Sequence, residues 1–403
     1  MRIVPLQIES RLQAASLMAG LRVSREGIKI LANKALPLAF RIDGIKSWAA
    51  NIIKQHMLSL GSDAAIERAA LLKDIKTSVL VFGSQSQFSR LCEKLANQPF
   101  GLKEAAEKIS ACLDNRETTR VLRCRDKVLR LKAPIVCAIM NLTPDSFSGD
   151  GLISRAHDQK TLIDLALAGA EGMIKNGAKI IDIGGESSRP FSKPVKEAEE
   201  IRRVIPAVKA IRKEFRKIII SVDTYKYAVA KEAAFAGADI INDITALRHS
   251  PKIAQIIVKH KLGCVLMHMR GMPATMQVSP YYQDVMAEVM DFFDQRLRFV
   301  RQQGIKESQV MVDPGIGFGK RRQDNLQIIK NLYQLRLFGL PVFVGLSRKS
   351  FISSSGGCPA GQRLSGSLAA AVLAAARGAD IVRAHDVRET AQALKIASAI
   401  LDS

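Results

Sequence analysis

Several features that mark particular classes of protein are missing from this chain of 403 residues. A membrane span requires about 20 apolar residues in a row, and no apolar run in the chain is nearly that long. The short apolar stretch 368–376 ends at Arg377. The N-terminus has Glu9 and Arg11 where a secretory signal would be apolar, and its strand-like start argues against a mitochondrial presequence. We therefore expect no membrane partner and no secretion.

Cysteine pairs with metal-binding spacing are also missing. The chain has no C-x-x-C pair, and its six cysteines are Cys92, Cys112, Cys124, Cys137, Cys264 and Cys358. In a chain of this size such cysteines are typical of reduced thiols in a cytosolic protein. We expect a cytoplasmic location and no zinc site.

Acidic and aromatic residues are scarce. There are 38 acidic against 60 basic residues, a net charge of +22, and aromatic residues make up 5%. Such a charge suits nucleic acid, an acidic membrane surface or small anions. The basic residues are dispersed, however, and few aromatic rings are available to stack on single strands. This composition favours a solvated basic surface that attracts small anionic molecules, with no nucleic-acid partner.

Residues 1–130 have the pattern of a separate, smaller α or α+β domain. Apolar residues at helical spacing predict helices over 10–21, 49–60, 63–72, 87–96 and 102–113, and TSVLVFG at 77–83 predicts one strand. The later stretch VLRCRDKVLRL, 121–131, has the pattern of a strand or hairpin. No catalytic constellation occurs before residue 130, so the role of this domain stays open, with packing or assembly favoured over a second reaction.

Residues 131–403 show a regular alternation of β-branched runs and amphipathic helical stretches. The eight runs are 135–141, 179–186, 217–224, 239–244, 264–270, 309–315, 341–348 and 380–386. Strand–helix alternation with strands apolar throughout predicts a parallel sheet, and eight units of this length predict a (β/α)₈ barrel. An open doubly wound sheet is the alternative, although no G-x-G-x-x-G follows the first run.

Polar residues stand at the end of every predicted strand, where a parallel barrel builds its active site. Asp223, Asn242, Asp313 and Lys349 offer donors and acceptors suited to a flat, nitrogen-rich heterocycle. The segment VDPGIGFGK, 312–320, adds glycines that let backbone approach a planar ligand.

A second group of strand-end residues suits a doubly charged phosphate. Arg189, Arg383 and His385 can form charge-assisted hydrogen bonds with phosphate oxygens. Asn141 offers a neutral oxygen to Mg²⁺, which takes few protein ligands when phosphate completes its shell. Phe318 would form a wall beside the heterocycle.

At these residues the sequence resembles the dihydropteroate synthase family, in a long form with an N-terminal extension. The motifs, in the order and spacing of the family, are IMNLTPDSFS, GGESSRP, SVDT, DIINDI, LMHM, DPGIGFGK, GLSRKSF and RAHD. The resemblance covers about residues 133–400 and implies a TIM barrel. It implies a transferase of folate biosynthesis that joins 6-hydroxymethyl-7,8-dihydropterin diphosphate to p-aminobenzoate, with Mg²⁺, and is the target of sulfonamides.

The resemblance also implies a role for each matching position. It assigns pterin binding to Asp223, Asn242, Met267, Asp313 and Lys349 and diphosphate binding to Asn141, Arg189, Arg383 and His385, with Asn141 also the metal ligand. It assigns p-aminobenzoate binding to Ser188, Pro190, Phe318, Lys349 and Ser350 and catalysis to Asp313, Lys349 and Arg189. The family is thought to lose diphosphate before the amine attacks. It often forms dimers, so we expect a homodimer.

Three positions depart from the family pattern. Ser188 stands where threonine is more frequent, and Ala384 where valine is. The first loop has Gly149 and Asp150 in the reverse of the usual order, which leaves the effect of the shifted acid on activity open.

Two other interpretations stay open at this point. A pterin-dependent methyltransferase would use a similar set of acids and amides but would need no diphosphate-binding residues such as Arg383. A barrel without activity that binds nucleic acid would use the net charge but not the polar strand ends.

Overall fold

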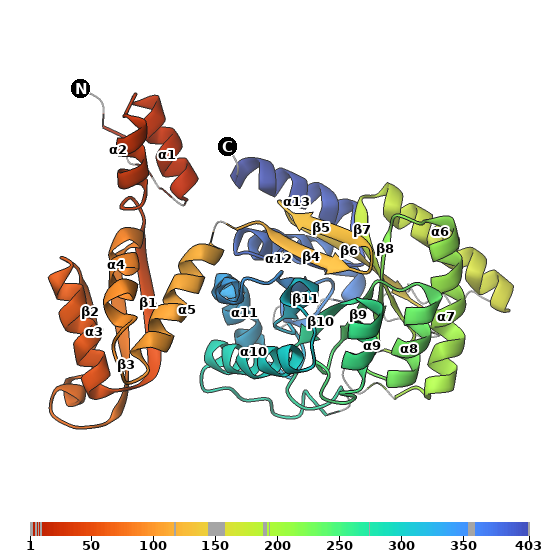
Figure 1. The fold of residues 1–403 in the computed structure, drawn as a ribbon. Helices are drawn as coiled ribbons and strands as arrows, with labels where there is room; N and C mark the ends of the chain where they lie inside the picture. Colours follow the sequence, from red (N-terminus) through yellow and green to blue (C-terminus); the bar gives the residue numbers. More distant parts are fainter. Residues whose placement is uncertain are drawn as a thin grey trace. The chain divides into compact units, whose positions relative to one another are not determined.

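The computed structural model describes residues 3, 4, 6, 8, 10–116, 118–143, 158–187, 192, 194–273, 275–353 and 359–401. It divides into two compact units, Met1–Thr118 and Thr119–Ser403 (Figure 1). The division lies earlier than the boundary at residue 130 expected from the sequence, because the segment 120–131 folds as part of the second unit. In the described part of the chain no helix is long and apolar enough to cross a membrane.

The first unit is an α+β structure built on a three-stranded antiparallel sheet in the order β1-β3-β2. Its elements are α1 (Arg11–Gly20), α2 (Arg25–Ala32), β1 (Pro37–Lys46), α3 (Ser47–Ser59), β2 (Asp63–Ile66), η1 (Arg68–Leu71), β3 (Lys76–Ser84), α4 (Gln85–Leu95) and α5 (Leu102–Asn115). Alternate residues of β3, among them Val79 and Val81, share a core with Ile53 of α3 and Phe88 of α4. The other residues of that strand, Leu80 and Phe82, are exposed.

The helix predicted over 63–72 is wrong. The segment forms β2, which pairs with β3 from Asp63 opposite Phe82 to Ile66 opposite Val79, and then the 3₁₀ turn η1. Its alanines favour a helix locally, but pairing with β3 satisfies the backbone groups and buries Ala64, so the tertiary contact overrides propensity.

The second unit is the predicted (β/α)₈ barrel. Its eight parallel strands have the order β11-β10-β9-β8-β7-β6-β13-β12. They are β6 (Ile135–Asn141), β7 (Ala178–Gly184), β8 (Ile219–Asp223), β9 (Ile240–Asp243), β10 (Gly263–Met267), β11 (Val310–Asp313), β12 (Phe343–Gly345) and β13 (Ile381–Ala384). A parallel bridge between Val312 and Val342 joins the two end strands and completes the ring.

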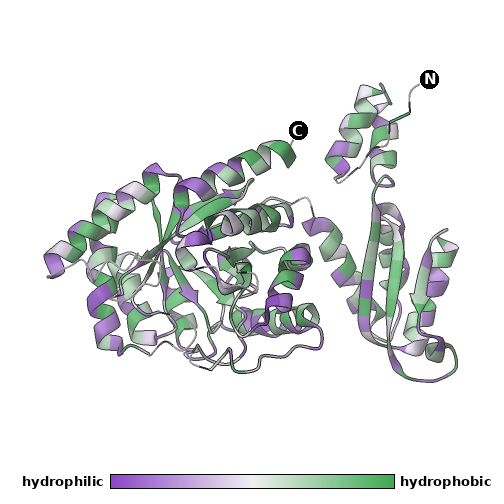
Figure 2. Ribbon diagram, turned by 180° about the vertical axis from the view of Figure 1, so that it is seen from behind, coloured by the Kyte–Doolittle hydropathy of each residue, from purple (hydrophilic) through white to green (hydrophobic). Residues whose placement is uncertain are grey.

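Amphipathic helices surround this ring. They are α6 (Gln159–Lys175), α7 (Glu197–Glu214), α8 (Tyr227–Ala236), α9 (Ile253–His260), α10 (Val285–Gln302), α11 (Arg322–Lys330), α12 (Leu364–Ala376) and α13 (Val387–Leu401). α10 shows why they form. The Asp284 carboxylate caps this helix by accepting hydrogen bonds from the amides of Met286 and Ala287. Val289 and Phe293 lie one turn apart on its buried face. Hydrophobic residues line the strands inside this ring (Figure 2).

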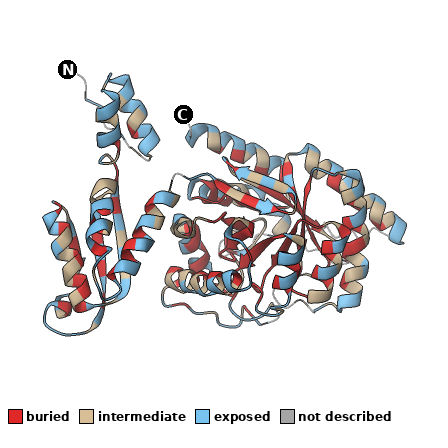
Figure 3. Cartoon of the chain, in the orientation of Figure 1, coloured by how far each residue is buried: buried red, intermediate tan, exposed pale blue. Residues whose placement is uncertain are grey.

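The amino-terminal end of the barrel is closed by a hairpin of β4 (Arg120–Cys124) and β5 (Lys127–Leu131). Leu122, Cys124 and Leu131 are buried against a layer of inward-facing residues, one from each strand: Cys137, Ile180, Ile219, Ile240, Val265, Met311, Phe343 and Ile381. Figure 3 shows burial along the strands and on part of the hairpin. The hairpin therefore supplies the apolar floor of the barrel.

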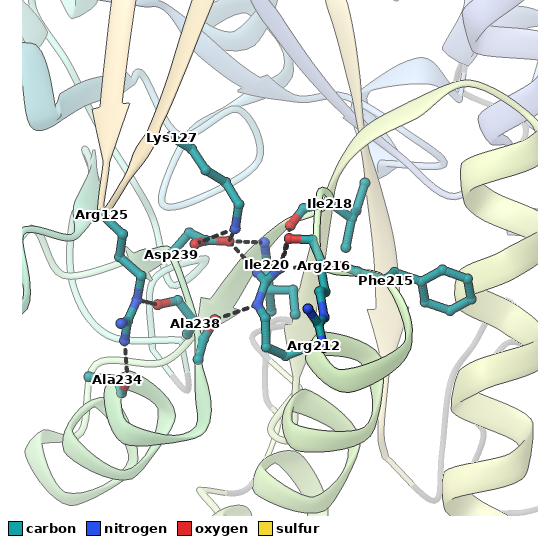
Figure 4. Close-up of polar contacts among 11 residues, drawn as sticks. Arg125, Lys127, Arg212, Phe215, Arg216, Ile218, Ile220, Ala234, Ala238 and Asp239 are labelled. Carbon is teal, nitrogen blue, oxygen red and sulfur yellow. Dashed lines mark hydrogen bonds and ion pairs between the residues drawn. The ribbon is translucent and has the colours of Figure 1, made fainter.

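A buried carboxylate, Asp239, fixes the hairpin to the strands (Figure 4). Its oxygens accept from Lys127 Nζ at 2.7 and 2.9 Å and from the Ile220 amide at 2.9 Å. Arg212 also pairs with Asp239 and donates to the carbonyls of Gly237, Arg216 and Ile218. Every charge in this cluster thus has partners supplied by the chain itself.

Candidate active site

The carboxyl ends of the strands bring the predicted polar residues to one end of the barrel. Asp223 ends β8 directly opposite Asn242 of β9, and Met267 ends β10 directly opposite Asp313 of β11. Arg383 lies in β13, opposite Gly345 of β12. Parallel register places these side chains side by side although they are up to 160 positions apart in the chain.

Arg383 is held between two carboxylates. Its Nε donates to Asp182 Oδ2 at 2.6 Å, and its Nη2 donates to Asp223 Oδ2 at 2.9 Å. Asn242 donates to the same Asp182 oxygen at 3.0 Å. Asp182 is fully buried in the middle of β7 and therefore organises both Arg383 and Asn242.

Burial shifts the ionisation of this cluster. It raises the pKa of Asp223 to about 7, against the opposing effect of the Arg383 guanidinium. Burial by itself would lower the pKa of Arg383, but the Asp182 and Asp223 carboxylates outweigh it and raise that pKa. Arg383 therefore stays charged while Asp223 titrates near neutral pH.

Asp313 is 5% exposed and begins the glycine-rich loop after β11. Its Oδ1 accepts from the Gly315 amide at 2.7 Å. Burial raises the pKa of Asp313, and the nearby Lys349 ammonium opposes that rise. Its hydrogen bond comes from a backbone amide and not from a charged side chain, so this buried carboxylate suits a ligand that brings its own donors.

Lys349 and Phe318 face each other across this site. Lys349 Nζ lies 4.6 Å from the centroid of the Phe318 ring and donates to the Ile316 carbonyl. Burial lowers the pKa of Lys349 to about 8, against the Asp313 carboxylate, which raises it. Phe318 packs on a buried apolar cluster of Met267, Tyr225, Ile244, Met269 and Met276. The arrangement offers a flat apolar wall with a cation above it.

Residues that follow β13 hold the segment after β12 in place. Arg348 pairs with Asp386 through Nε at 3.1 Å and Nη2 at 2.6 Å. His385 Nδ1 lies 3.0 Å from Ser347 Oγ. Ser350 follows Lys349 at the start of η5 (Ser350–Ile352) and is exposed. Ser347 and Arg348, which directly precede Lys349, are therefore tied to His385 and Asp386, which follow β13.

Comparison with known proteins identifies the barrel. The sequence pattern of the family described as pterin binding enzyme matches residues 137–385. The dihydropteroate synthase of Haemophilus influenzae is 44% identical over 275 residues, which are 68% of this chain and 97% of that protein. The chain belongs to the dihydropteroate synthase family. It is a transferase of folate biosynthesis that forms dihydropteroate.

Solved dihydropteroate synthases share the fold. The Yersinia pestis enzyme, solved in a sulfonamide drug complex, is 43% identical with a TM-score of 0.66 and covers 70% of this chain and 100% of its own. The Xanthomonas albilineans enzyme, solved with 4-aminobenzoic acid, is 39% identical with a TM-score of 0.64 and covers 71% of this chain and 100% of its own. These likenesses exclude the open doubly wound sheet and the barrel without activity, and they replace the methyltransferase interpretation.

The family pattern does not reach the first unit. It begins at residue 137, and 275 residues of this chain account for nearly all of the H. influenzae enzyme. Residues 1–118 are therefore additional to the dihydropteroate synthase barrel of that relative.

Several predicted site residues fall outside the described part of the chain. Ser188, Arg189 and Pro190 of the GGESSRP motif are among them, and so are Gly149 and Asp150 of the first loop. Asn141, at the end of β6, is described and half-buried. In the described ranges no three His, Cys, Asp or Glu side chains lie close enough to hold a metal ion.

Two groups of polar residues near the site were missed by reasoning from the sequence. The first is Asp182. The sequence feature that could have indicated it is an acid inside an otherwise apolar strand, two residues before the strand ends. The other is Lys226, whose Nζ donates to Glu186 and Glu200 at 2.5 Å each and to the Val195 carbonyl at 2.6 Å. Tyr225 also donates to Glu186, at 2.7 Å, so this cluster anchors the segment after β7.

Proposed function

We propose that the carboxyl end of the barrel joins 6-hydroxymethyl-7,8-dihydropterin diphosphate to p-aminobenzoate and releases 7,8-dihydropteroate and diphosphate. The observation that carries this proposal is the group of Asp223, Asn242, Asp313, Lys349 and Arg383, drawn from separate strands to one end of the barrel. The likeness to dihydropteroate synthases solved with a sulfonamide and with 4-aminobenzoic acid supports the same substrates here.

The pterin would bind between β8, β9 and β11. The carboxylates of Asp223 and Asp313 would accept from ring nitrogens and the amino group, while Asn242 and Lys349 would meet the remaining ring atoms. The pterin would pack on Met267, which is 3% exposed within the apolar cluster. The raised pKa of both acids supports this binding, because a buried carboxylate gains most when a ligand supplies its missing donors.

The diphosphate would bind at the ends of β6 and β13. Asn141, Arg189, Arg383 and His385 would contact its oxygens. Two of the nitrogens of Arg383 are used by carboxylates, and its Nη1 supplies further donors. The raised pKa of Arg383 keeps its guanidinium charged, which supports a role in stabilising the leaving diphosphate.

Mg²⁺ fits this site only together with the substrate. Among the described residues Asn141 offers one neutral oxygen, and no acidic cluster could hold the ion alone. This donor set suits an ion that keeps most of its shell on phosphate oxygens and water. When bound, Mg²⁺ would neutralise charge on the diphosphate.

The p-aminobenzoate would bind beside the pterin. Phe318 and Lys349 supply a flat wall and a cation, and Ser350 would meet the carboxylate. Ser188 and Pro190 would complete this subsite. Sulfonamides, which share the aromatic amine, would bind in the same place.

The reaction breaks the C–O bond between the pterin methylene and the diphosphate and forms a C–N bond to the aromatic amine. The electron pair of the C–O bond leaves with the diphosphate, and the amine loses one proton. Asp313 would stabilise positive charge that develops on the pterin, and Arg383 and Arg189 would stabilise the departing anion. Asp313, Lys349 and Arg189 are thus the proposed catalytic residues.

The assembly and location follow from other features. An apolar groove of about 390 Å³ lies between α11 and α12, lined by Leu326, Ile329, Phe351, Ala370 and Leu373. Leu373 is 58% exposed, which supports a homodimer that covers this face. The five described cysteines are all free thiols, which supports a cytoplasmic location. The first unit would serve packing or assembly, since its sheet exposes Leu80 and Phe82.

The test is diphosphate release by the purified chain, supplied with the pterin diphosphate, p-aminobenzoate and Mg²⁺. We expect release that depends on the amine, with dihydropteroate formed in equal amount and sulfonamide inhibition that p-aminobenzoate relieves. Release without the amine, or none at all, would contradict the proposal.

A further inference from the structure

The glycine-rich loop Gly315–Gly319 after β11 contains one backbone turn, in which the Phe318 amide donates to the Gly315 carbonyl at 3.1 Å, and its carbonyls are also bound by side chains. Its three glycines have positive φ angles of 65°, 83° and 61°. The donors are Lys320 for Gly315 and Phe318, Lys349 for Ile316, Gln277 for Gly317 and Tyr282 for Gly319. The loop that carries Phe318 is thus shaped from outside, mostly by side chains.

Lys320 is the centre of this arrangement. It is 3% exposed, and its Nζ lies 3.0 Å from the Gly315 carbonyl and 3.1 Å from the Phe318 carbonyl. The same nitrogen lies 3.2 Å from the His268 carbonyl and 2.9 Å from His268 Nδ1. It therefore joins both ends of the loop to the segment that follows β10.

This geometry calls for a neutral His268 and a charged Lys320. Burial, and then the charges of Lys320 and Arg248, lower the pKa of His268 to about 2, so its ring is neutral and Nδ1 can accept. Lys320 Nζ lies within hydrogen-bond distance of four acceptors, an environment that the three donors of an ammonium suit better than a neutral amine does. Burial lowers the pKa of Lys320 to about 7, and Asp313 opposes that effect.

The loop lies directly on the backbone after β10. A Cβ atom at Gly315 would be 2.0 Å from the His268 carbonyl oxygen, and one at Gly319 would be 2.3 Å from the Arg270 carbonyl oxygen. Because the contact is so close, the loop can adopt only this position on the backbone after β10 while its carbonyls stay hydrogen-bonded. Phe318, between these glycines, then faces Lys349 at 4.6 Å.

We propose that Lys320 is a positioning residue for the amine subsite: its ammonium fixes the Gly315–Gly319 loop on β10 and so sets the place of Phe318. Lys320 contacts neither substrate in this arrangement, and the inference rests on the proposed function. Pterin binding depends less on Lys320, because Asp223, Asn242, Met267 and Asp313 all lie in strands, and the charge of Lys349 acts on Asp313 more strongly than that of Lys320.

The test compares Lys320→Met with Lys320→Gln, which have similar length and differ in whether the side chain can donate. The control is Lys231→Met, on the exposed surface of α8. Each variant is assayed for kcat and for KM of both substrates. Calorimetry then measures pterin binding and, with the pterin and diphosphate present, p-aminobenzoate binding.

We expect Lys320→Met to raise the KM and the Kd for p-aminobenzoate about tenfold while pterin affinity changes less than about threefold. Lys320→Gln should recover part of the loss, and the control should match the unaltered chain. Tyr282→Phe, which removes the donor to Gly319 and a contact with Arg270, should shift p-aminobenzoate binding in the same direction by about threefold and serves if Lys320→Met does not fold.

Equal weakening of both substrates, or a lower melting temperature with both KM values unchanged, would overturn the positioning role. Absence of both turnover and binding in the unaltered chain would instead overturn the proposed function, and this inference with it. The two failures are therefore distinguishable.

Discussion

The two ends of the barrel use buried charge in opposite ways. At the amino-terminal end, Asp239 is fully buried and receives donors from Lys127, Arg212 and the Ile220 amide, above an apolar floor. At the carboxyl end, burial displaces the pKa values of Asp223, Asp313 and Lys349, and the opposite charges nearby do not fully offset it. Charges that are fully paired hold the fold together, and charges that are incompletely paired are available to a ligand.

The largest effect should follow from removing the floor. A chain that begins at Thr119 keeps the hairpin, whereas one that begins at Ala133 loses Leu122, Cys124 and Leu131 from the core. At about 1.5–3 kcal/mol for each buried side chain, the second chain should lose roughly 5 kcal/mol of unfolding free energy. Urea unfolding of both chains measures this difference. Equal stability would show that the hairpin is dispensable.

The next effect concerns the carboxyl end. Asp313→Asn and Lys349→Ala should each lower kcat/KM by roughly 10²–10³-fold, because each removes a group placed on the pterin or the amine. The melting temperature should stay the same or rise, since burial disfavours the charge on both groups. Turnover assays and thermal unfolding together check this. Unchanged turnover in either variant would contradict the pocket assignment.

The matched change at the amino-terminal end is Asp239→Asn. It keeps the shape of the side chain but removes the charge that Lys127 and Arg212 share, so we expect a loss of about 2–3 kcal/mol in unfolding free energy. Asp126→Asn, in the exposed turn of the same hairpin, is the control. Below the melting temperature of the variant, its kcat/KM should equal that of the unaltered chain. A loss of activity without a loss of stability would contradict the assignment of Asp239 to the fold alone.

The smallest effect is in the pH dependence. Asp223, with a pKa of about 7, is ionised above that pH and ready to accept from the pterin, whereas Lys349, with a pKa of about 8, is charged below that pH. We therefore expect the affinity for the pterin to rise through pH 7 and fall above pH 8, with roughly a fivefold increase between pH 6 and 7.5. Because Arg383 hydrogen-bonds both Asp223 and Asp182, the lower value belongs to that cluster.

The check on this assignment is pterin binding by Asp223→Asn. Affinity should be weaker than in the unaltered chain and should no longer rise between pH 6 and 7.5, because the amide does not titrate. An acid limb that persists in the variant would assign the lower pKa to another group.

Much of the barrel could be predicted because its pattern is local and periodic. Each of the eight strands was placed from a short apolar run, and the polar residues at the strand ends followed from the rule that a parallel barrel acts at that end. The exception in the first unit is instructive. Residues 63–72 have helical spacing, yet 63–66 form β2 and 68–71 a 3₁₀ turn, because β3 offered unpaired backbone groups that the local pattern does not reveal.

The sequence was less informative about residues that position other site residues and do not face the ligand themselves. Asp182 was passed over inside an apolar strand, although it holds both Arg383 and Asn242. Lys320 belonged to a recognised motif, but nothing in its spacing indicated that its ammonium would take the carbonyls of its own loop. Such roles depend on which backbone groups lack partners after folding.

By itself, the sequence determined the alternation of strands and helices, the residue types at the strand ends and the family, since each is carried by neighbours along the chain. Only the tertiary structure decided that Arg383 lies between Asp182 and Asp223, that 120–131 closes the barrel and that Lys320 joins the loop to β10. These contacts join positions up to 201 residues apart, and they form because parallel register and burial force each charge to find the partner that water no longer provides.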